Sequence, residues 1–321
     1  MKQVHKAVRS ALLATIAALA LTGGPAAAET PAGDIRIADT RVFPESVTVD
    51  SRGRIYAGSF KGTIYRSLPG SGVAEPWITP TAGNGILAIL GVFADDRTGT
   101  LWACSIPATI TDPPKTGRSE LMAFDLETGE QKGRYPLPDP DPAACNDIAI
   151  DAGGTVFATD TPNGRILTLA PGAEALEVLA ADDALRGIDG LAFDGDGTLY
   201  INNVQKNLLQ RVDRAADGSY AGLTTLTTSL PLSGPDGLRS LGGNRFLQAE
   251  GPIGRITEVT IEGDSARIQV LKEGLDGSAG VTPAGAVAYA TEGKIGYLVD
   301  PKLKGQDPGE FHLRAVPLEA Q

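Results

Sequence analysis

A recurring sequence pattern places oxygen-bearing side chains at the same position in several copies. Each copy has a first residue, an alternating strand, a turn rich in Asp and Gly, and a second strand of β-formers, and residues 146–160 are the clearest example. We call the first residue of each copy the lead residue. In register, the lead residues are Glu45, Leu90, Asn146, Asp189, Asp236 and Ser278. Four of these six carry a carboxylate or an amide oxygen, which are the donors that hard metal ions prefer.

Carboxylates that share one space repel one another unless protons or a cation neutralise them. A donor set made only of oxygen suits a hard ion, and Ca²⁺ is preferred over Mg²⁺ where the cage is wide and adaptable. No lead residue is His or Cys, which argues against zinc or copper. The sequence therefore predicts one divalent cation, Ca²⁺, held by Glu45, Asn146, Asp189 and Asp236. The alternative is that these residues only cap strands and satisfy turn donors.

The spacing of the lead residues indicates which elements bring them together. Successive lead residues are about 42 to 56 residues apart, and each interval is expected to hold about four short strands. That period is typical of propeller blades. We therefore predict an all-β, six-bladed β-propeller with four-stranded blades, whose ring is closed by an N-terminal strand at residues 34–43, with a β-sandwich as the alternative. Each lead residue begins an innermost strand, so the lead residues should face one another near one mouth of the central channel.

The second and sixth repeats depart from the common pattern. The second contains a long insertion at residues 106–118, which includes Thr111 and Asp112. This loop is expected either to lie over the channel mouth and shape a pocket or to be a surface loop without ligand contact. The sixth repeat contains residues 294–300, which are expected to form its third strand, followed by a frayed tail.

The composition limits the partners. The chain of 321 residues has 39 Asp and Glu against 28 Lys and Arg, which gives a formal net charge of −11. Such a chain lacks the basic surface that binds nucleic acid or anionic lipid. We expect a monomer that binds a small molecule, with no nucleic-acid partner.

Residues 1–28 are predicted to be a signal peptide, with a basic start, an apolar run at residues 11–21 and small residues at 26–28. The apolar run is short for a membrane span, and an uncleaved anchor is the alternative. Residues 29–321 would then form one domain, exported to the periplasm or secreted, with no membrane attachment after cleavage. Export allows a disulfide between Cys104 and Cys145, but their spacing leaves two buried thiols as an equal alternative.

The repeats resemble the senescence marker protein, gluconolactonase and luciferin-regenerating enzyme family, and more distantly diisopropyl fluorophosphatase and paraoxonase. The resemblance covers residues 34–318 and rests on FPESVTVD, CNDIAID and GPDGL, which contain Glu45, Asn146 and Asp236. It implies a six-bladed propeller with a catalytic divalent cation, usually calcium, in its channel. GIDGLAFD departs from the family pattern, because it has Asp189 where the family usually has Asn. The additional charge should tighten cation binding and lessen Lewis acidity.

The same resemblance implies a metal-dependent hydrolase that opens a lactone or ester by attack of water. Asp236 is then the expected catalytic carboxylate, as a base or as a nucleophile, and Asn146 is a candidate for contacting substrate. Sugar lactonases of the family have an Arg two residues before this Asn, where the present chain has Ala144. Arg186 is the candidate replacement, although it also fits a solvated loop position.

Other reaction chemistries have little support in the sequence. His312 is the one histidine of residues 29–321, and there is no G-x-S-x-G motif, so His-assisted nucleophilic hydrolysis lacks its parts. The competing class is a non-enzymatic propeller that binds a ligand or a protein and whose metal is purely structural, because a fold does not by itself grant an activity. An open coordination position that faces a pocket would favour the enzyme.

Overall fold

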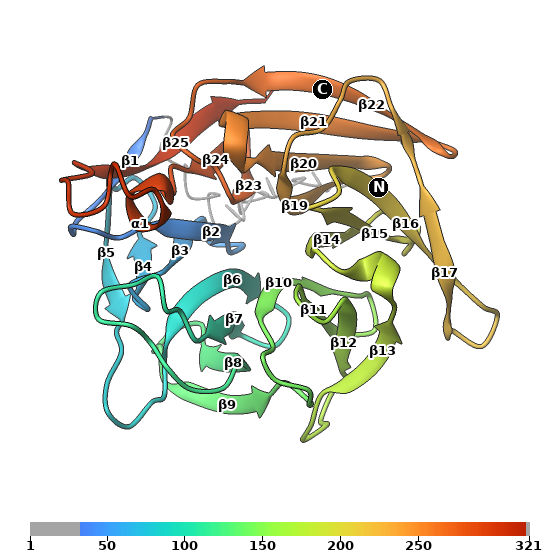
Figure 1. The fold of residues 1–321 in the computed structure, drawn as a ribbon, viewed down its shortest axis with the longest axis horizontal. Helices are drawn as coiled ribbons and strands as arrows, with labels where there is room; N and C mark the ends of the chain where they lie inside the picture. The colour runs from blue at the N-terminus through green and yellow to red at the C-terminus, as the bar shows by residue number, and fades with distance from the viewer. Residues whose placement is uncertain (1–32, 319–321) are drawn as a thin grey trace, which may run out of the picture.

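The structure, a computed structural model, describes residues 33–318, so the predicted signal peptide lies outside the described residues. Regular structure in this range is almost entirely β-strand, with one four-residue α-helix and two short 3-10 helices, and none of its helices is long and apolar enough to cross a membrane. Figure 1 shows the strands grouped into sheets around a common centre, which is a propeller-like architecture. The prediction of an all-β fold is confirmed.

Within residues 33–318 the strands form five hydrogen-bonded sheets, and three of these have four strands in sequence order. The three are β6 (Ala88–Asp95), β7 (Thr100–Ile106), β8 (Glu120–Asp125) and β9 (Gln131–Pro136); β10 (Cys145–Ile150), β11 (Val156–Asp160), β12 (Arg165–Leu169) and β13 (Glu177–Ala181); and β14 (Ile188–Phe193), β15 (Leu199–Asn203), β16 (Leu208–Arg214) and β17 (Tyr220–Thr225). A fourth sheet contains β19 (Pro235–Gly242), β20 (Arg245–Glu250), β21 (Arg255–Glu262), β22 (Ser265–Lys272) and the short β18 (Thr227–Thr228). The 3-10 helices are η1 (Asp183–Leu185) and η2 (Gly251–Ile253).

The fifth sheet joins the two ends of the described chain. Its order is β2 (Pro44–Val49), β3 (Ile55–Ser59), β4 (Ile64–Ser67), β5 (Val73–Ile78), β1 (Ile35–Ile37), β25 (Phe311–Pro317), β24 (Val287–Thr291) and β23 (Val281–Ala284). Strand β1 pairs antiparallel with β25, so the N-terminal strand lies beside the last repeat as expected, and it also pairs parallel with β5. It ends at Ile37 and is shorter than the predicted 34–43, and Arg41 and Phe43 adopt positive φ angles that a strand excludes.

The predicted strand at residues 294–300 is wrong. The segment contains the helix α1 (Gly296–Val299), and β25 takes the position of the third strand. The Val299 N–H donates to the carbonyl four residues earlier, so this peptide group is satisfied within the segment. Pairing with β25 fills the free edge of β24, which leaves no edge for another strand. Leu298 packs instead into the apolar cluster formed between the first and last repeats.

Apolar clusters fill the space between neighbouring repeats and hold the inner strands in place. Phe157 of β11 and Ile201 of β15 are buried in one cluster, and Val47 of β2 and Tyr289 of β24 are buried in another. Full burial of a large apolar side chain stabilises the folded state by about 1.5–3 kcal/mol. Strands β2, β6, β10, β14, β19 and β23 lie nearest the centre of the molecule (Figure 1), and the lead residues of the repeats lie within three residues of the start of these strands.

Candidate metal centre

A β-bulge lies at the lead residue in five of the inner strands. The residue before the lead residue pairs with the end of the neighbouring second strand, and regular pairing resumes only three residues later. The interrupted intervals are 44–47 in β2, 89–92 in β6, 145–148 in β10, 188–191 in β14 and 235–238 in β19. A bulge bends the strand and re-aims a side chain. The lead residues therefore leave the regular sheet pairing at the same end of each of these strands.

Glycine follows the lead residue in several repeats and packs against the next lead residue. A Cβ at Gly190 would lie 2.3 Å from the carbonyl oxygen of Asp236, and a Cβ at Gly91 would lie 2.3 Å from that of Asn146. These positions exclude any larger side chain, so neighbouring inner strands can approach closely at the lead residues.

The same packing identifies the sixth lead residue. A Cβ at Gly280 would lie 2.7 Å from the carbonyl oxygen of Glu45, so Gly280 occupies the position that follows a lead residue. A Cβ at Gly237 would lie 2.6 Å from the carbonyl oxygen of Ala279. The lead residue of the sixth repeat is therefore Ala279 rather than the predicted Ser278. The short hairpin of the last repeat hides this shift of one residue in the sequence.

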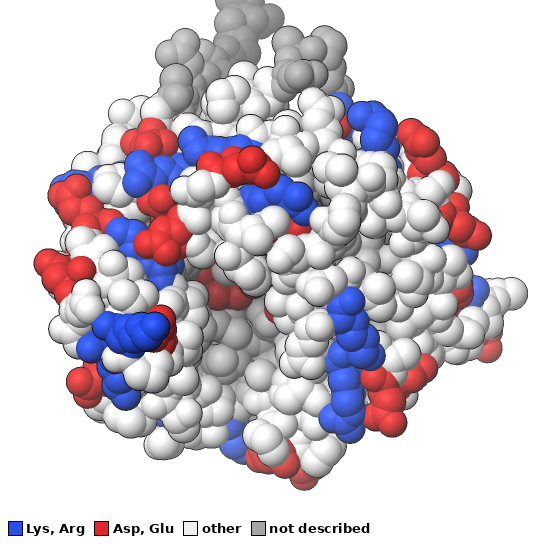
Figure 2. All heavy atoms as spheres, turned by 45° about the horizontal axis from the view of Figure 1, so that its top comes forward, with Lys and Arg blue, Asp and Glu red and all other residues white. Residues whose placement is uncertain are grey.

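Four oxygen-bearing lead side chains share one space at the centre. The Asn146 Nδ2 donates to Asp189 Oδ2 over 2.9 Å, and a hydrogen bond links the carboxyl groups of Asp189 and Asp236. The charge of Glu45 acts on the pKa of Asp236. Glu45, Asn146 and Asp189 are buried, whereas Asp236 is partly exposed. Figure 2 shows Asp and Glu atoms inside a hollow near the centre of the face in view.

Burial and mutual repulsion raise the pKa values of the three lead carboxyls well above their ordinary values. Burial is the largest cause for each of them. The second largest cause is the charge of a neighbouring carboxylate. It is Asp189 for the pKa of Glu45, Asp236 for the pKa of Asp189, and Glu45 for the pKa of Asp236. Such a cluster favours either protonation of its carboxyl groups or a bound cation that neutralises them.

The donor chemistry of the lead residues fits a hard divalent cation. Asn146 Oδ1 is buried and has no hydrogen-bond partner within residues 33–318, and an unpaired buried acceptor is costly. Asp189 and Asp236 are joined to each other, however, and no three His, Cys, Asp or Glu side chains of the described chain form a metal-ligand group. The unpaired Asn146 oxygen is a further donor among the described residues, and amide oxygens suit such an ion as carboxylates do. A cation bound by both aspartates would replace the hydrogen bond between them.

A buried arginine beside the lead residues was not predicted. Arg239 of β19 binds Asp147 of β10 through two contacts, Nη1 to Oδ2 at 2.7 Å and Nη2 to Oδ1 at 2.9 Å. Its Nη2 also donates to the carbonyl oxygen of Val92 in β6 at 3.3 Å and to Ser46 Oγ in β2 at 3.4 Å. One side chain thus joins four inner strands, and its charge opposes the rise in the pKa of Glu45.

The sequence contains a signal for this arginine. The third position after the lead residue holds Thr48, Phe93, Ala149, Ala192 and Thr282 in the other repeats, so Arg239 is the charged exception. A charge at a buried repeat position requires a buried partner. The partner Asp147 is 92 residues away, and no local pattern indicates it.

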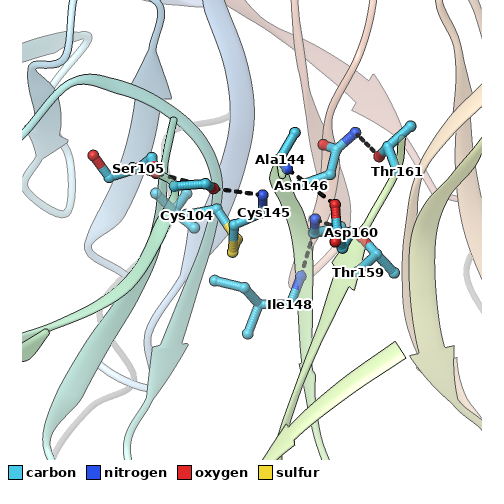
Figure 3. The surroundings of a disulfide bond; sticks show 12 residues. Cys104, Ser105, Ala144, Cys145, Asn146, Ile148, Thr159, Asp160 and Thr161 are labelled. Carbon is cyan, nitrogen blue, oxygen red and sulfur yellow. Dashed lines mark hydrogen bonds between the residues drawn. A yellow bond between two sulfur atoms is a disulfide. The ribbon is translucent and has the colours of Figure 1, made fainter. Parts of the chain in front are cut away.

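A disulfide fixes the start of β10 and therefore the position of Asn146. Cys104 of β7 and Cys145 are bonded, so the disulfide is the correct one of the two alternatives left open by the sequence. The Cys145 N–H donates to Ser119 Oγ over 2.8 Å, and the Asn146 Nδ2 donates to Thr161 Oγ1 over 3.0 Å. Figure 3 shows the amide nitrogen of Asn146 directed at Thr161 and its amide oxygen directed away.

Arg186 lies in a solvated loop. Its Nε donates to Asp183 Oδ1 over 2.8 Å and its Nη1 to the carbonyl oxygen of Pro162 over 2.7 Å, and its side chain is 56% exposed. None of its hydrogen bonds to the described residues reaches a lead residue. The insertion at residues 106–118, in contrast, follows the lead end of β7 and lines a cavity.

Comparisons with known proteins support the fold. A family model described as strictosidine synthase-like, N-terminal, matches residues 35–67, and no curated protein matches the sequence. The allergen Mala s 1 of Malassezia sympodialis superposes with a TM-score of 0.65 at 14% identity, over 88% of this chain and 96% of the allergen.

Two further solved structures are named after enzymes. A luciferin-regenerating enzyme gives a TM-score of 0.59 at 14% identity, over 89% of this chain and 92% of the enzyme. A putative gluconolactonase gives 0.55 at 19% identity, over 91% of this chain and 97% of the other. These findings support the resemblance to the gluconolactonase and luciferin-regenerating enzyme family as a shared propeller-like fold. A fold shared at such low identity does not specify the reaction.

Proposed function

We propose that this protein is a calcium-dependent hydrolase of the gluconolactonase type, which opens a lactone or ester by attack of water. The observation that carries the proposal is the buried Oδ1 of Asn146, which has no partner among the described residues and shares one space with three lead carboxyls. The eight-stranded sheet would then be two four-stranded blades that meet at β1 and β5, which gives six blades. It also treats the protein as a monomer that is exported to the periplasm or secreted.

The roles of the residues follow from burial and charge. Glu45, Asn146, Asp189 and Asp236 would hold the ion, and a divalent cation bound there would polarise the carbonyl oxygen of the substrate. We assign the catalytic role to Asp236, because it is the partly exposed member of the four. It would act as a base toward water or as a nucleophile toward the carbonyl carbon. Both roles need an ionised carboxylate, and a bound cation would favour that form by opposing the rise in the pKa of Asp236.

The test measures calcium binding and turnover on the same preparations of residues 29–321. Elemental analysis and calorimetric titration of EDTA-treated protein should show a tightly bound calcium ion in the parent and in Asp189→Asn, and much weaker binding in Asp236→Ala. Asp217→Asn, in an exposed turn, is the matched control and should behave as the parent. A panel of lactones and esters should be hydrolysed only with calcium present. Turnover by folded, metal-free protein would overturn the proposed mechanism.

A non-enzymatic, ligand-binding propeller is the second candidate. It is favoured by the hydrogen-bonded pair of Asp189 and Asp236, which satisfies two lead residues without a metal. A folded parent that binds no calcium and hydrolyses none of the esters would select this candidate. A bound calcium whose coordination positions are all filled by protein atoms would select it as well.

A further inference from the structure

A cavity of about 300 Å³ lies at the lead end of the first repeat. It is formed by residues 40–43, residues 60–61, the insertion at 106–118 and helix α1. Phe43 is two residues before the lead residue Glu45, and the Phe60 N–H donates to the Phe43 carbonyl oxygen over 3.1 Å. Because the end of β3 pairs with the start of β2, the cavity and Glu45 lie at the same end of these strands.

The cavity carries an excess of positive charge. Arg41, Lys61 and Lys115 line it, against one acidic residue, Asp112. Lys61 is paired with Asp39 at 2.6 Å, which neutralises part of this charge. A basic cavity in a chain of net charge −11 is a local exception, and it favours an anion over a cation or a neutral molecule.

Lys115 is the partly buried cation of this cavity. Its backbone N–H and carbonyl both bond to Ala108 at 2.9 Å, and this bridge fixes its place in the insertion. Its ammonium group has no ion-pair or hydrogen-bond partner within residues 33–318, and burial lowers the pKa of Lys115. An anion beside the ammonium group would offset this loss of solvation.

We infer that this cavity binds an anionic group of the substrate, so that the natural substrate is a small ester or lactone with a carboxylate on an apolar body; this inference rests on the proposed function. Phe43, Phe60 and Leu298 supply the apolar surface for that body. The volume is at the lower end of the range for small-molecule sites, which suits a carboxylate on a compact apolar body.

A second cavity, of about 530 Å³, provides the internal comparison. It lies at the opposite end of the strands, between the hairpin turns of β6–β7 and β10–β11. Its cations already have partners: Arg97 donates to the Ala152 carbonyl oxygen at 3.1 Å, and Lys132 donates to Thr100 Oγ1 at 2.8 Å. Arg97→Gln is therefore a matched control for substitutions at Lys115.

The experiment has a binding arm and a turnover arm, both with residues 29–321 in calcium. Calorimetry with 4-phenylbutyrate and its neutral amide should show tighter binding of the acid. Lys115→Gln should weaken binding of the acid about tenfold, as expected for loss of a charge-assisted contact, and Lys115→Glu should abolish it. Both Lys115 substitutions should leave the affinity for the amide unchanged, and Arg97→Gln should leave the affinity for both ligands unchanged.

In the turnover arm, 4-acetoxybenzoate is compared with its neutral methyl ester. Lys115→Gln should raise the KM for the anionic ester about tenfold with little change in kcat, and leave the neutral one unchanged. Equal binding of acid and amide, or full binding of the acid by Lys115→Glu, would overturn the inference. Binding that depends on Lys115 without any ester hydrolysis would refute the proposed function and the substrate assignment while leaving the anion site. Calcium-dependent hydrolysis whose rate depends neither on Lys115 nor on the charge of the ester would support the proposed function and refute the anion site.

Discussion

Replacing Arg239 with methionine should lower the free energy of unfolding by about 4 kcal/mol. Arg239 and Asp147 are joined by contacts of 2.7 and 2.9 Å, and their side chains are only 8% and 6% exposed. Breaking such a buried pair typically costs about 3–5 kcal/mol, because it leaves an uncompensated charge on the partner. The lost hydrogen bond to the Val92 carbonyl oxygen adds to this cost, so the upper half of the range is expected.

Urea denaturation followed by tryptophan fluorescence measures the effect as a shift in midpoint at unchanged slope. Arg267→Met is the control, because Arg267 and Glu262 are 3.7 Å apart with side chains 54% and 61% exposed, and such pairs contribute about 0–1 kcal/mol. A loss below about 1 kcal/mol for Arg239→Met would refute the argument that this residue holds the inner strands together.

The double variant Arg239→Met with Asp147→Asn separates the pair from general packing. If the main cost is an uncompensated buried charge, removing that charge should recover part of the stability. The double variant should then be more stable than the sum of the single losses by at least about 1 kcal/mol. Additive losses would show that Arg239 acts mainly through its packing and its contacts with backbone carbonyls.

Three other outcomes are expected. Asp236→Ala should bind calcium much more weakly and lose turnover, measured by titration and by ester hydrolysis, and a variant that keeps both would remove Asp236 from the site. Folding raises the pKa values of the lead carboxyls, so in EDTA their contribution to stability is present below about pH 4 and is lost as the pH rises through the raised values. Asp189→Asn should therefore gain stability relative to the parent between pH 4 and 8, measured by thermal unfolding. A stability difference between variant and parent that does not change with pH would contradict this. Replacing Cys104 and Cys145 together by Ala should cost about 2–4 kcal/mol in denaturant and weaken calcium binding, and unchanged affinity would show that the disulfide does not position the site.

The sequence predicted the elements because they depend on local pattern. The alternation after each lead residue predicts an inner strand, and the Asp and Gly turns predict the hairpins. The repeat period placed Glu45, Asn146, Asp189 and Asp236 at equivalent strand ends, and the structure brings these side chains into one space. The segment at residues 294–300 was misassigned, because its alternating apolar residues suit a strand while β25 already fills the sheet edge.

Only the tertiary structure decided the contacts between residues that are distant in the sequence. Arg239 binds Asp147 across 92 residues, and Lys115 lines one cavity with Phe43 and Phe60 only through the folding of separate loops. The bulges at the lead residues were invisible for the same reason, since a bulge is defined by the partner strand. A strand forms from the pattern of its own residues, whereas the partner of a buried charge depends on the closure of the whole ring. The sequence therefore determined which donors line the centre, and the packing of the repeats decided which of them are paired and which remain available to a ligand.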